Sequence, residues 1–344
     1  MMKEATFSVA LVRNTLQYAA AHHSVDPQSL CAAIGIDPGL LETPDSRING
    51  EVNRAMWREV MKHTGDDHIG LHLGEAFNPS AVGILGYVLF SCQTLSQVFE
   101  KLSRYMRLFS QGVYIHCSVS QGQLLCDCDI VAHLQNYLLE EPRQPVESTF
   151  AAILTAVKLL TGKPLYPYAV WFQHPRPADS SEHQRIFQSP VHFAQPTNRL
   201  IFDASCLEWA VLSANSTLLS VFEQHAETML NDLSQHETYT NQVVRAITEG
   251  LKGEIPSVEA IAHHLAISVR HLQRELKKEG TSYQQLLDRT RNELAIRYLK
   301  KPDIMIDDIA FLLGFSEPSA FHRAFKRWTG KTPRSYRLLQ RGKI

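Results

Sequence analysis

An internal repeat near the C-terminal end of the 344-residue chain is the feature that most restricts its fold. Residues 258–278 recur at 306–327, shifted by 48 residues in the first half and by 49 in the second. In each copy, apolar residues recur at intervals of three and four, the period of one helix face. Each copy is therefore predicted to be a helix, a tight turn and a second helix. In this helix-turn-helix arrangement, the second helix typically enters a DNA major groove.

Small residues stand one helical turn apart in the first helix of each copy. They are Ala262 with Ala266 in the first copy and Ala310 with Gly314 in the second. We expect these pairs to let a partner helix approach closely.

The segment between the copies is predicted to be one continuous helix. Residues 283–299 contain no Pro or Gly, and Lys301-Pro302 is expected to end the helix because Pro cannot continue it. About twenty residues would span roughly 30 Å, close to the ~34 Å between successive major grooves on one face of DNA. Ser268 and Ser316 stand where the second helices are expected to begin, and a hydroxyl there can cap free backbone amides.

Charge is divided unevenly along the chain. Residues 1–239 hold 15 Lys and Arg against 24 Asp and Glu, whereas residues 240–344 hold 19 against 11. A basic segment of this kind favours a nucleic-acid partner. The polar stretch 231–242 lies at the change of sign, so we divide the chain into 1–235, a linker with one helix at 236–256, and 257–344.

The basic segment also carries a family resemblance. Residues 257–339 resemble the DNA-binding domain of AraC/XylS-type transcription regulators, chiefly in 309–327 and in the ending Gly-x-Thr-Pro-x-x-Tyr-Arg at 330–337. The resemblance implies an all-α domain in which two helix-turn-helix units are joined by a long helix.

The second helix of each unit offers side chains for reading bases. Arg270, Gln273 and Arg274 lie at i, i+3 and i+4 and therefore share one helix face. Arg pairs with guanine and Gln with adenine through two hydrogen bonds. The alternative is that this face is only a solvated basic surface. These three positions match those that read bases in the family, and the corresponding face of the second unit offers poorer readers at two of its three positions. The expected base-reading residues are Arg270, Gln273, Arg274, Ser319, His322 and Arg323.

Other polar residues of these helices are assigned to phosphates, whose contacts strengthen binding at any sequence. The expected phosphate contacts are Ser268, Lys277, Lys278, Ser316, Lys326, Arg327 and Arg334. Leu272, Leu276, Phe321, Phe325 and Trp328 have core spacing and are expected only to pack.

The acidic segment is predicted to be α+β, because helical periodicity and strand alternation both occur in it. Alternation at 113–119 and 124–130 around Gln121-Gly122 predicts a β-hairpin. The other predicted strands are 168–173 and 199–203, and the predicted helices are 8–23, 27–34, 50–63, 67–77, a pair within 84–109, 146–161 and 215–233.

Residues from about 20 to 210 are similar to the arabinose-binding-like effector domain of AraC-type regulators, through features such as Gly83-Ile84-Leu85-Gly86-Tyr87. This similarity implies a small-molecule effector and dimerisation, without identifying the effector. Tyr105, Arg107 and Phe109 are candidate effector-binding residues. The alternative is that Tyr105 and Phe109 are core residues and Arg107 a surface charge.

Signals for enzymatic chemistry are weak. His68 and His72 are one turn apart, a spacing that can ligate zinc, but they lack the HExxH pattern and an evident third ligand. Nucleophile motifs and phosphate-binding loops are absent from the sequence. The six cysteines show no CxxC spacing and are expected to be reduced thiols. We therefore expect no enzyme activity, no cofactor and no metal.

The sequence is thus interpreted as a cytoplasmic transcription regulator, expected to activate, whose DNA binding is tuned by a small molecule. The expected partners are double-stranded DNA, an effector, RNA polymerase and a second copy of the chain. A membrane is not expected, because the longest uncharged apolar run, 81–90, is half the ~20 residues needed. Two alternatives stay open, an N-terminal platform that binds only proteins and an enzyme fused to a DNA-binding module.

Overall fold

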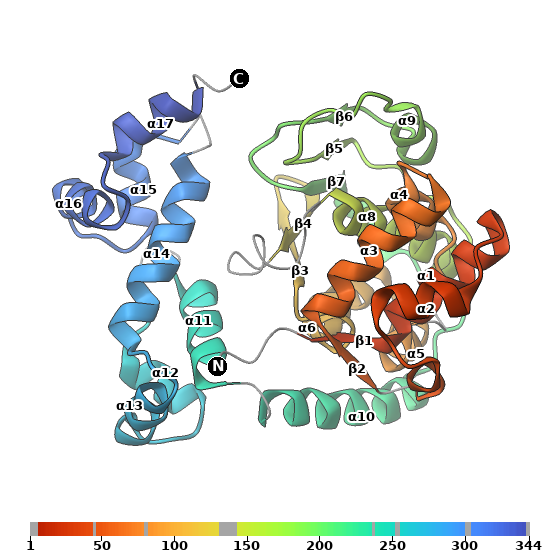
Figure 1. Ribbon diagram of the computed structural model, residues 1–344, viewed down its shortest axis with the longest axis horizontal. Helices are drawn as coiled ribbons and strands as arrows, with labels where there is room; N and C mark the ends of the chain where they lie inside the picture. Colours follow the sequence, from red (N-terminus) through yellow and green to blue (C-terminus); the bar gives the residue numbers. More distant parts are fainter. Residues whose placement is uncertain are drawn as a thin grey trace. The chain divides into compact units, whose positions relative to one another are not determined.

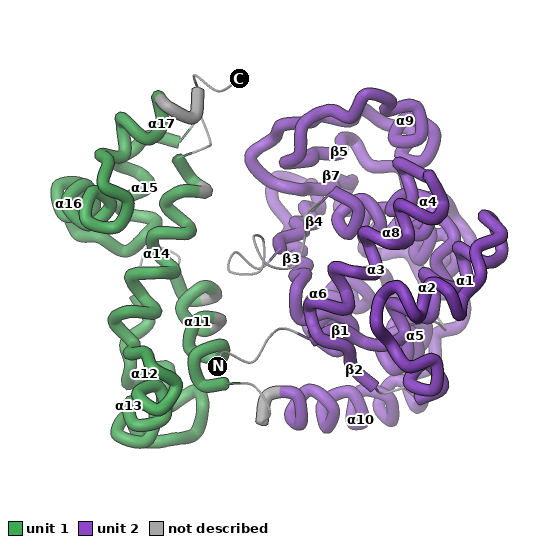
Figure 2. Tube along the Cα trace, in the orientation of Figure 1, with its two compact units in different colours: residues 1–3, 234–344 green, residues 4–233 purple. Residues whose placement is uncertain are grey.

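The computed structural model describes residues 6–43, 46–78, 82–130, 143–235, 238–251, 255–299 and 304–341. It divides into two compact units, with the boundary between Leu233 and Ser234 (Figure 2). We call residues 4–233 the N-terminal unit and residues 234–344 the C-terminal unit. The predicted helix terminator Lys301-Pro302 lies outside the described residues.

The first part of the N-terminal unit is a small helical layer with its own hydrophobic core, which includes Leu30, Met56 and Trp57. Its helices begin where polar side chains accept backbone N–H groups, as Ser8 does from Ala10 and Asn49 does from Val52. The elements are β1 (Thr6–Ser8), α1 (Val9–His23), α2 (Pro27–Ile34), the 3₁₀ helix η1 (Pro38–Glu42), β2 (Arg47–Asn49) and α3 (Gly50–Thr64), with β1 antiparallel to β2.

A five-stranded sheet forms the rest of the unit together with a second group of helices (Figure 1). The strand order is β3-β4-β7-β5-β6, and only the β5–β6 pair is parallel. The predicted hairpin is confirmed, because β3 pairs with β4 from Val113↔Ile130 to Ser120↔Gln123. The strands are β3 (Val113–Ser120), β4 (Gln123–Ile130), β5 (Ala169–Trp171), β6 (Val191–His192) and β7 (Arg199–Asp203).

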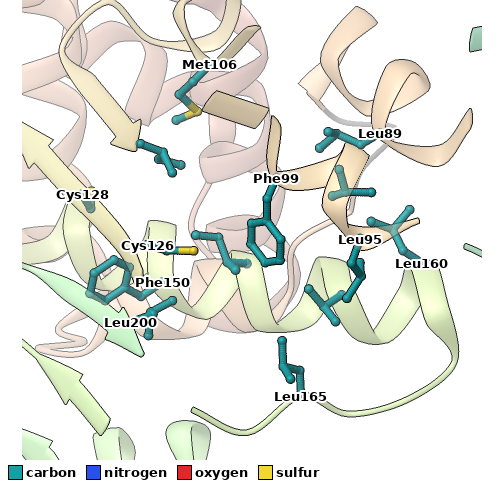
Figure 3. Packing of buried hydrophobic residues seen from close by; sticks show 14 of the residues in the cluster. Leu89, Leu95, Phe99, Met106, Cys126, Cys128, Phe150, Leu160, Leu165 and Leu200 are labelled. Carbon is teal, nitrogen blue, oxygen red and sulfur yellow. The ribbon is translucent and has the colours of Figure 1, made fainter. Parts of the chain in front are cut away.

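Helices and sheet share a second, larger core. Figure 3 shows Phe99 of α6, Phe150 of α8, Cys126 of β4 and Leu200 of β7 within it. The elements packed around the sheet are α4 (Ile69–Glu75), α5 (Ile84–Ser91), α6 (Leu95–Phe109), α8 (Arg143–Thr161), α9 (Ser181–Phe187), the 3₁₀ helix η3 (Ala204–Glu208) and α10 (Ser216–Gln235). This mixture of sheet and helices is the predicted α+β architecture.

Two glycines bring α4 against α8. A Cβ added to Gly70 would collide with the backbone of Gln144, and one added to Gly74 with the carbonyl of Ser148. The two backbones therefore approach more closely than any larger residue would allow. This contact fixes the first turns of α8, which carry residues important below.

The C-terminal unit is helical, as predicted, and has a third core of its own. Figure 1 shows α12 and α13 near one end of α14, with α15 and α16 toward the other. Leu272, Leu276, Phe321 and Phe325 are fully buried, which confirms their predicted packing role, and Trp328 is half-buried against them. The helices are α11 (Tyr239–Gly250), α12 (Val258–His264), α13 (Val269–Lys278), α14 (Tyr283–Leu299), α15 (Ile306–Leu312), α16 (Pro318–Thr329) and α17 (Pro333–Arg341).

Two local predictions in this unit are wrong. Ala266 and Gly314 do not serve helix packing, because both lie in the turn with left-handed backbone, at φ 54° and φ 69°. Ser316 is not the cap of α16, which begins at Pro318 after Glu317. The reason is the extra residue of the second copy, which lies just before the helix and moves Ser316 one position too early. Ser268 does cap α13, accepting the N–H of His271 at 3.2 Å.

Candidate DNA interface and candidate effector cavity

Helix α13 presents a polar face opposite its buried residues. Because Leu272 and Leu276 point into the core, the positions between them face outward. The side chains of Arg270, Gln273 and Arg274 are all exposed, and the helix spacing places them together. The structure thus places these three side chains together on the exposed face of α13, as their spacing predicts.

Ion pairs along α13 hold part of its positive charge. Arg274 donates to Glu275 Oε1 at 3.1 Å and lies 2.8 Å from His271 Nδ1, while Lys278 contacts both oxygens of Glu275 at 2.9 Å. Hydrogen bonds from Lys278 and Arg274 lower the pKa of Glu275, so its carboxylate stays ionised. Arg274 and Lys278 thus both have a local partner in Glu275, whereas Lys277 is exposed on the same helix.

Helix α16 carries the equivalent positions of the second unit. Ser319 and Arg323 are exposed, and Ser319 donates to Glu317 at 3.2 Å. His322 is half-buried, with its ring at the edge of Phe321. Of these three residues, Arg323 alone is exposed and carries the bidentate donors suited to guanine.

The remaining predicted phosphate contacts are all at the surface. Lys326, Arg334 and Ser316 are exposed. Arg327 is also exposed and donates to Asp288 of α14 at 3.1 Å. The predicted phosphate-contact side chains of the two helix-turn-helix units are therefore all exposed on the C-terminal unit, and their burial does not prevent phosphate contact.

A cavity of about 380 Å³ lies inside the N-terminal unit. Residues of α1, α3, α4, α5, α6, α8 and β3 line it, so it opens between the helical layer and the sheet-bearing part. Most of the wall is apolar, with Trp57, Phe77, Phe99 and Met106 among the larger side chains. The polar residues of the wall are Asn14, Thr15, Gln17, Tyr18, His22, Asn53, Asn78, Ser110, Ser148 and Thr149.

Asn53 is a polar residue of the wall whose side-chain oxygen lacks a hydrogen-bond donor. Its side chain is 2% exposed, and its Oδ1 has no hydrogen-bond partner. Thr15, also buried, is satisfied by donating to the carbonyl of Leu11 at 2.9 Å. Since buried polar atoms are nearly always hydrogen-bonded, an acceptor without a donor beside a cavity points to a ligand that supplies one.

One of the three predicted effector residues lines this cavity. Phe109 is part of the wall, but Tyr105 and Arg107 are not among its residues. The Tyr105 hydroxyl instead donates to Glu227 of α10 at 2.5 Å, and Arg104 donates to the same oxygen at 2.6 Å. Burial and this hydrogen bond raise the pKa of Tyr105 to about 12. Sequence reasoning missed the wall residues on α1 and α3, for which no local signal exists.

The two histidines considered for zinc do not converge on one site. His72 lies with Nδ1 2.6 Å from Asp66 and Nε2 3.0 Å from Glu182, on opposite sides of its ring. His68 lies instead beside Arg143, whose guanidinium is 3.2 Å from His68 Nδ1.

The cysteines are mostly interior. Five of the six are buried, and burial raises the pKa of Cys92 to about 12 and of Cys206 to about 11. Thiols of this kind stay protonated and react slowly.

Among the helices of the described residues, none is both long and apolar enough to cross a membrane.

Comparison with protein families identifies both units. Residues 25–211 match the arabinose-binding domain of AraC transcription regulators, N-terminal part, and residues 261–338 match a helix-turn-helix domain. The chain is 31% identical over 317 residues to the ornithine utilization regulator of Pseudomonas aeruginosa, covering 92% of each chain. It is 27% identical over 312 residues to the transcriptional regulator VirS of Mycobacterium tuberculosis, covering 91% of each.

Solved structures also resemble it. The transcriptional regulator CdpR from Pseudomonas aeruginosa aligns over 96% of this chain and 98% of its own, with 23% identity and a TM-score of 0.49. The paired helix-turn-helix units and the domain match at each end agree with the family of the full-length relatives. The chain therefore belongs to the AraC family of DNA-binding transcription regulators and carries an arabinose-binding-like N-terminal domain.

Proposed function

We propose that the DNA binding of this regulator is tuned by an uncharged, mainly apolar small molecule held in the cavity of the N-terminal unit. The observation that carries the proposal is the unpartnered Oδ1 of Asn53 in a mainly apolar wall whose described residues include no Asp, Glu, Lys or Arg. Ligand pockets usually combine a large apolar surface with a few polar groups that orient the ligand, in volumes of ~300–1,000 Å³. The cavity, at about 380 Å³, has this size and composition.

The lining argues for a neutral ligand. Among the described residues of the wall there is no Asp, Glu, Lys or Arg. Burying a charged group without a partner is costly, so such a wall selects against ions. The relative from Pseudomonas aeruginosa is named for ornithine utilization, and ornithine carries a carboxylate and two ammonium groups. We infer that this chain responds to a different class, an apolar molecule with one hydrogen-bond donor such as an alcohol or an amide.

Helix α6 supplies a route from the cavity toward the DNA-binding unit. One face of α6 lines the cavity through Phe99 and Met106. The opposite face holds α10 through the pair Lys101–Glu223 at 2.7 Å and the hydrogen bond between Tyr105 and Glu227. Because α10 ends at the boundary between the units, a ligand that moves α6 would bias the placement of the C-terminal unit.

The roles of the DNA-contacting residues are part of this proposal. Arg270, Gln273 and Arg274 read bases through α13, Arg323 reads through α16, and Lys277 supplies a phosphate contact. Helix α14 has 17 residues, and at ~1.5 Å each it spans about 25 Å. This span is shorter than the ~34 Å between successive major grooves on one face of DNA, so the proposal that one chain recognises two of them rests on the paired units and not on the length of α14 alone.

Dimerisation is proposed through α10. Leu218 and Val221 lie three residues apart on this helix and are 45% and 57% exposed. A second copy of the chain would cover these apolar side chains. Size measurement by light scattering should give a dimer for the wild type and a monomer for Val221→Glu. Activation through RNA polymerase remains a prediction from the family resemblance.

The effector proposal is tested by thermal shift of the full chain with matched ligands. A series of straight-chain alcohols and primary amides is compared with carboxylic acids and amines of equal chain length. We expect the neutral compounds to raise the melting temperature, since a ligand at a hundredfold excess over its Kd adds ~2.7 kcal/mol. A shift with the charged compounds alone would overturn the assignment of ligand class.

Variants of the wall test whether the ligand binds in the cavity. Ala152→Phe puts a larger side chain into the cavity from the wall at α8. Leu159, on the same helix, is 48% exposed, so Leu159→Phe adds a ring outside the cavity. The first variant should abolish the shift and the second should preserve it. Asn53→Leu should weaken the binding of alcohols more than the binding of the parent alkanes. If no compound shifts the wild type but a purified partner protein does, the N-terminal unit is the interaction platform of the alternative interpretation.

A further inference from the structure

A buried carboxylate and two imidazoles, none of them a residue of the cavity wall, converge in the N-terminal unit. Glu147 comes from the start of α8, His174 from the segment after β5, and His183 from α9. Their ligand atoms all lie within 4.8 Å of one another. The side chains of Glu147 and His183 are fully buried, and that of His174 is 10% exposed.

The hydrogen bonding of His174 is incomplete in a specific way. Its Nδ1 lies 2.9 Å from the carbonyl oxygen of Pro175, which can only accept, so Nδ1 carries the proton. In the neutral ring, Nε2 is then a bare lone pair. That atom is buried, has no hydrogen-bond partner, and lies 3.3 Å from Glu147 Oε1. Two electron-rich atoms thus face each other where a cation would join them.

The second imidazole approaches the same oxygen. His183 Nε2 is 2.6 Å from Glu147 Oε1, and His183 Nδ1 is buried without a partner. When Nε2 binds a metal, the ring keeps its single proton by carrying it on Nδ1. His174 already has the arrangement common for metal ligands, in which the other ring nitrogen donates to a backbone carbonyl.

We propose that Glu147, His174 and His183 form a zinc-type metal site with three protein ligands and one position left for water. Two imidazoles and a carboxylate are a donor set known for Zn²⁺, with ligand distances of ~2.0–2.2 Å. Ca²⁺ and Mg²⁺ prefer oxygen ligands, and thiolates, which favour softer ions, are absent from the trio. His183 Nε2 and Glu147 Oε1 are 2.6 Å apart and would have to separate to admit an ion at these distances from both.

Arg143 is compatible with this site. Its Nε lies 2.9 Å from Oε1 and 3.1 Å from Oε2 of Glu147. An ion bound to Oε1 leaves Oε2 for the guanidinium, which would then hold the carboxylate in place from outside the ligand shell. The ion would tie α9 and the segment after β5 to the first turns of α8, next to the wall residues Ser148 and Thr149.

The test measures metal binding by the full chain after treatment with a chelator. Equilibrium dialysis should give one Zn²⁺ per chain, and Co²⁺ should produce visible absorption bands that Zn²⁺ displaces. His174→Ala and Glu147→Gln should each weaken metal binding at least ~tenfold. The reason is that even replacing a residue that only hydrogen-bonds to a metal ligand typically lowers the metal affinity by that factor. His72→Ala is the matched control, because its two carboxylate partners lie on opposite sides of the ring, and it should bind as the wild type does.

Folding is checked by circular dichroism and melting in the presence of chelator. His174 lies at the edge of the core, so His174→Ala decides the test should Glu147→Gln fail to fold. A wild type that binds neither Zn²⁺ nor Co²⁺ at micromolar concentrations would overturn the proposal. Equal affinity in His174→Ala and the wild type would overturn it as well.

Discussion

The guanidinium of Arg291 lies over the ring of Phe315, with 4.2 Å between its central carbon and the ring centroid. Arg291 belongs to the connecting helix α14, and Phe315 follows the turn of the second helix-turn-helix unit. Arg291 also donates to the carbonyls of Leu313 and Gly314, each at 2.9 Å. One side chain, 7% exposed, thus joins the connecting helix to the turn that orients α16.

Replacing Arg291 should therefore weaken the C-terminal unit. Arg291→Ala leaves the carbonyls of Leu313 and Gly314 without their charged donor, and we expect a loss of about 2–4 kcal/mol in the free energy of unfolding. Urea unfolding of the full chain measures this loss. Arg289→Ala, on the same helix but 38% exposed, is the control and should change stability little. Equal losses in both variants would contradict the role given to Arg291.

In the turns of the two helix-turn-helix units, exchanging Ala and Gly should have opposite effects on stability. Gly314→Ala forces a Cβ into the left-handed region and should cost about 1–2 kcal/mol. Ala266→Gly relieves the same strain at the equivalent turn, so it should leave stability unchanged or slightly higher. Thermal unfolding of both variants checks the signs. A destabilised Ala266→Gly would mean that its methyl group packs in a way the exposed position does not indicate.

Base reading and phosphate contact are separable by mutation on α13. Arg274→Ala should relax the preference at one base pair and cost ~1–3 kcal/mol on the specific site, whereas Lys277→Ala should weaken all sequences alike and reduce the salt dependence. Titration of specific and random duplexes at several salt concentrations measures both effects. Equal losses on the two duplexes for both variants would refute the assignment.

The contacts of His72 with the carboxylates of Asp66 and Glu182 should make a pH-dependent contribution to the free energy of unfolding. The hydrogen bond to Asp66, assisted by Glu182, raises the pKa of His72 above 6.5 in the folded chain. This contribution is complete below pH 6.5 and is lost as the pH rises through the raised value. The stability difference between the wild type and His72→Gln should thus be larger near pH ~6 than near pH ~9 in chemical unfolding. A difference independent of pH would show that His72 acts only by packing.

Local patterns predicted much of the fold. Alternation around Gln121-Gly122 predicted the hairpin, because neighbouring residues on a strand must face opposite sides. The burial of Leu272 and Leu276 followed from helix periodicity, and this periodicity also placed Arg270 and Arg274 outward. These features depend on residues close together in the chain, so the sequence carries them directly.

Features that depend on distant contacts were not predictable in the same way. Tyr105 is on a helix with two packed faces, and its partner Glu227 lies 122 residues away, so periodicity could not tell the cavity face from the α10 face. The trio of Glu147, His174 and His183 comes from three separate elements and has no motif spacing. The position of Ser316 was misjudged because the shift from 48 to 49 reveals one inserted residue, but the apolar positions do not show at which point of the turn it lies.

The separate hydrophobic cores have an evolutionary consequence. The residues that fill the C-terminal core are all drawn from 239–336, and those of the other two cores from earlier in the chain. Substitutions that reshape the wall around Asn53 therefore leave the packing beneath α13 untouched. With the effector in this cavity, as proposed, a lineage can accumulate such changes and acquire a new effector while the DNA sequences that it recognises stay the same.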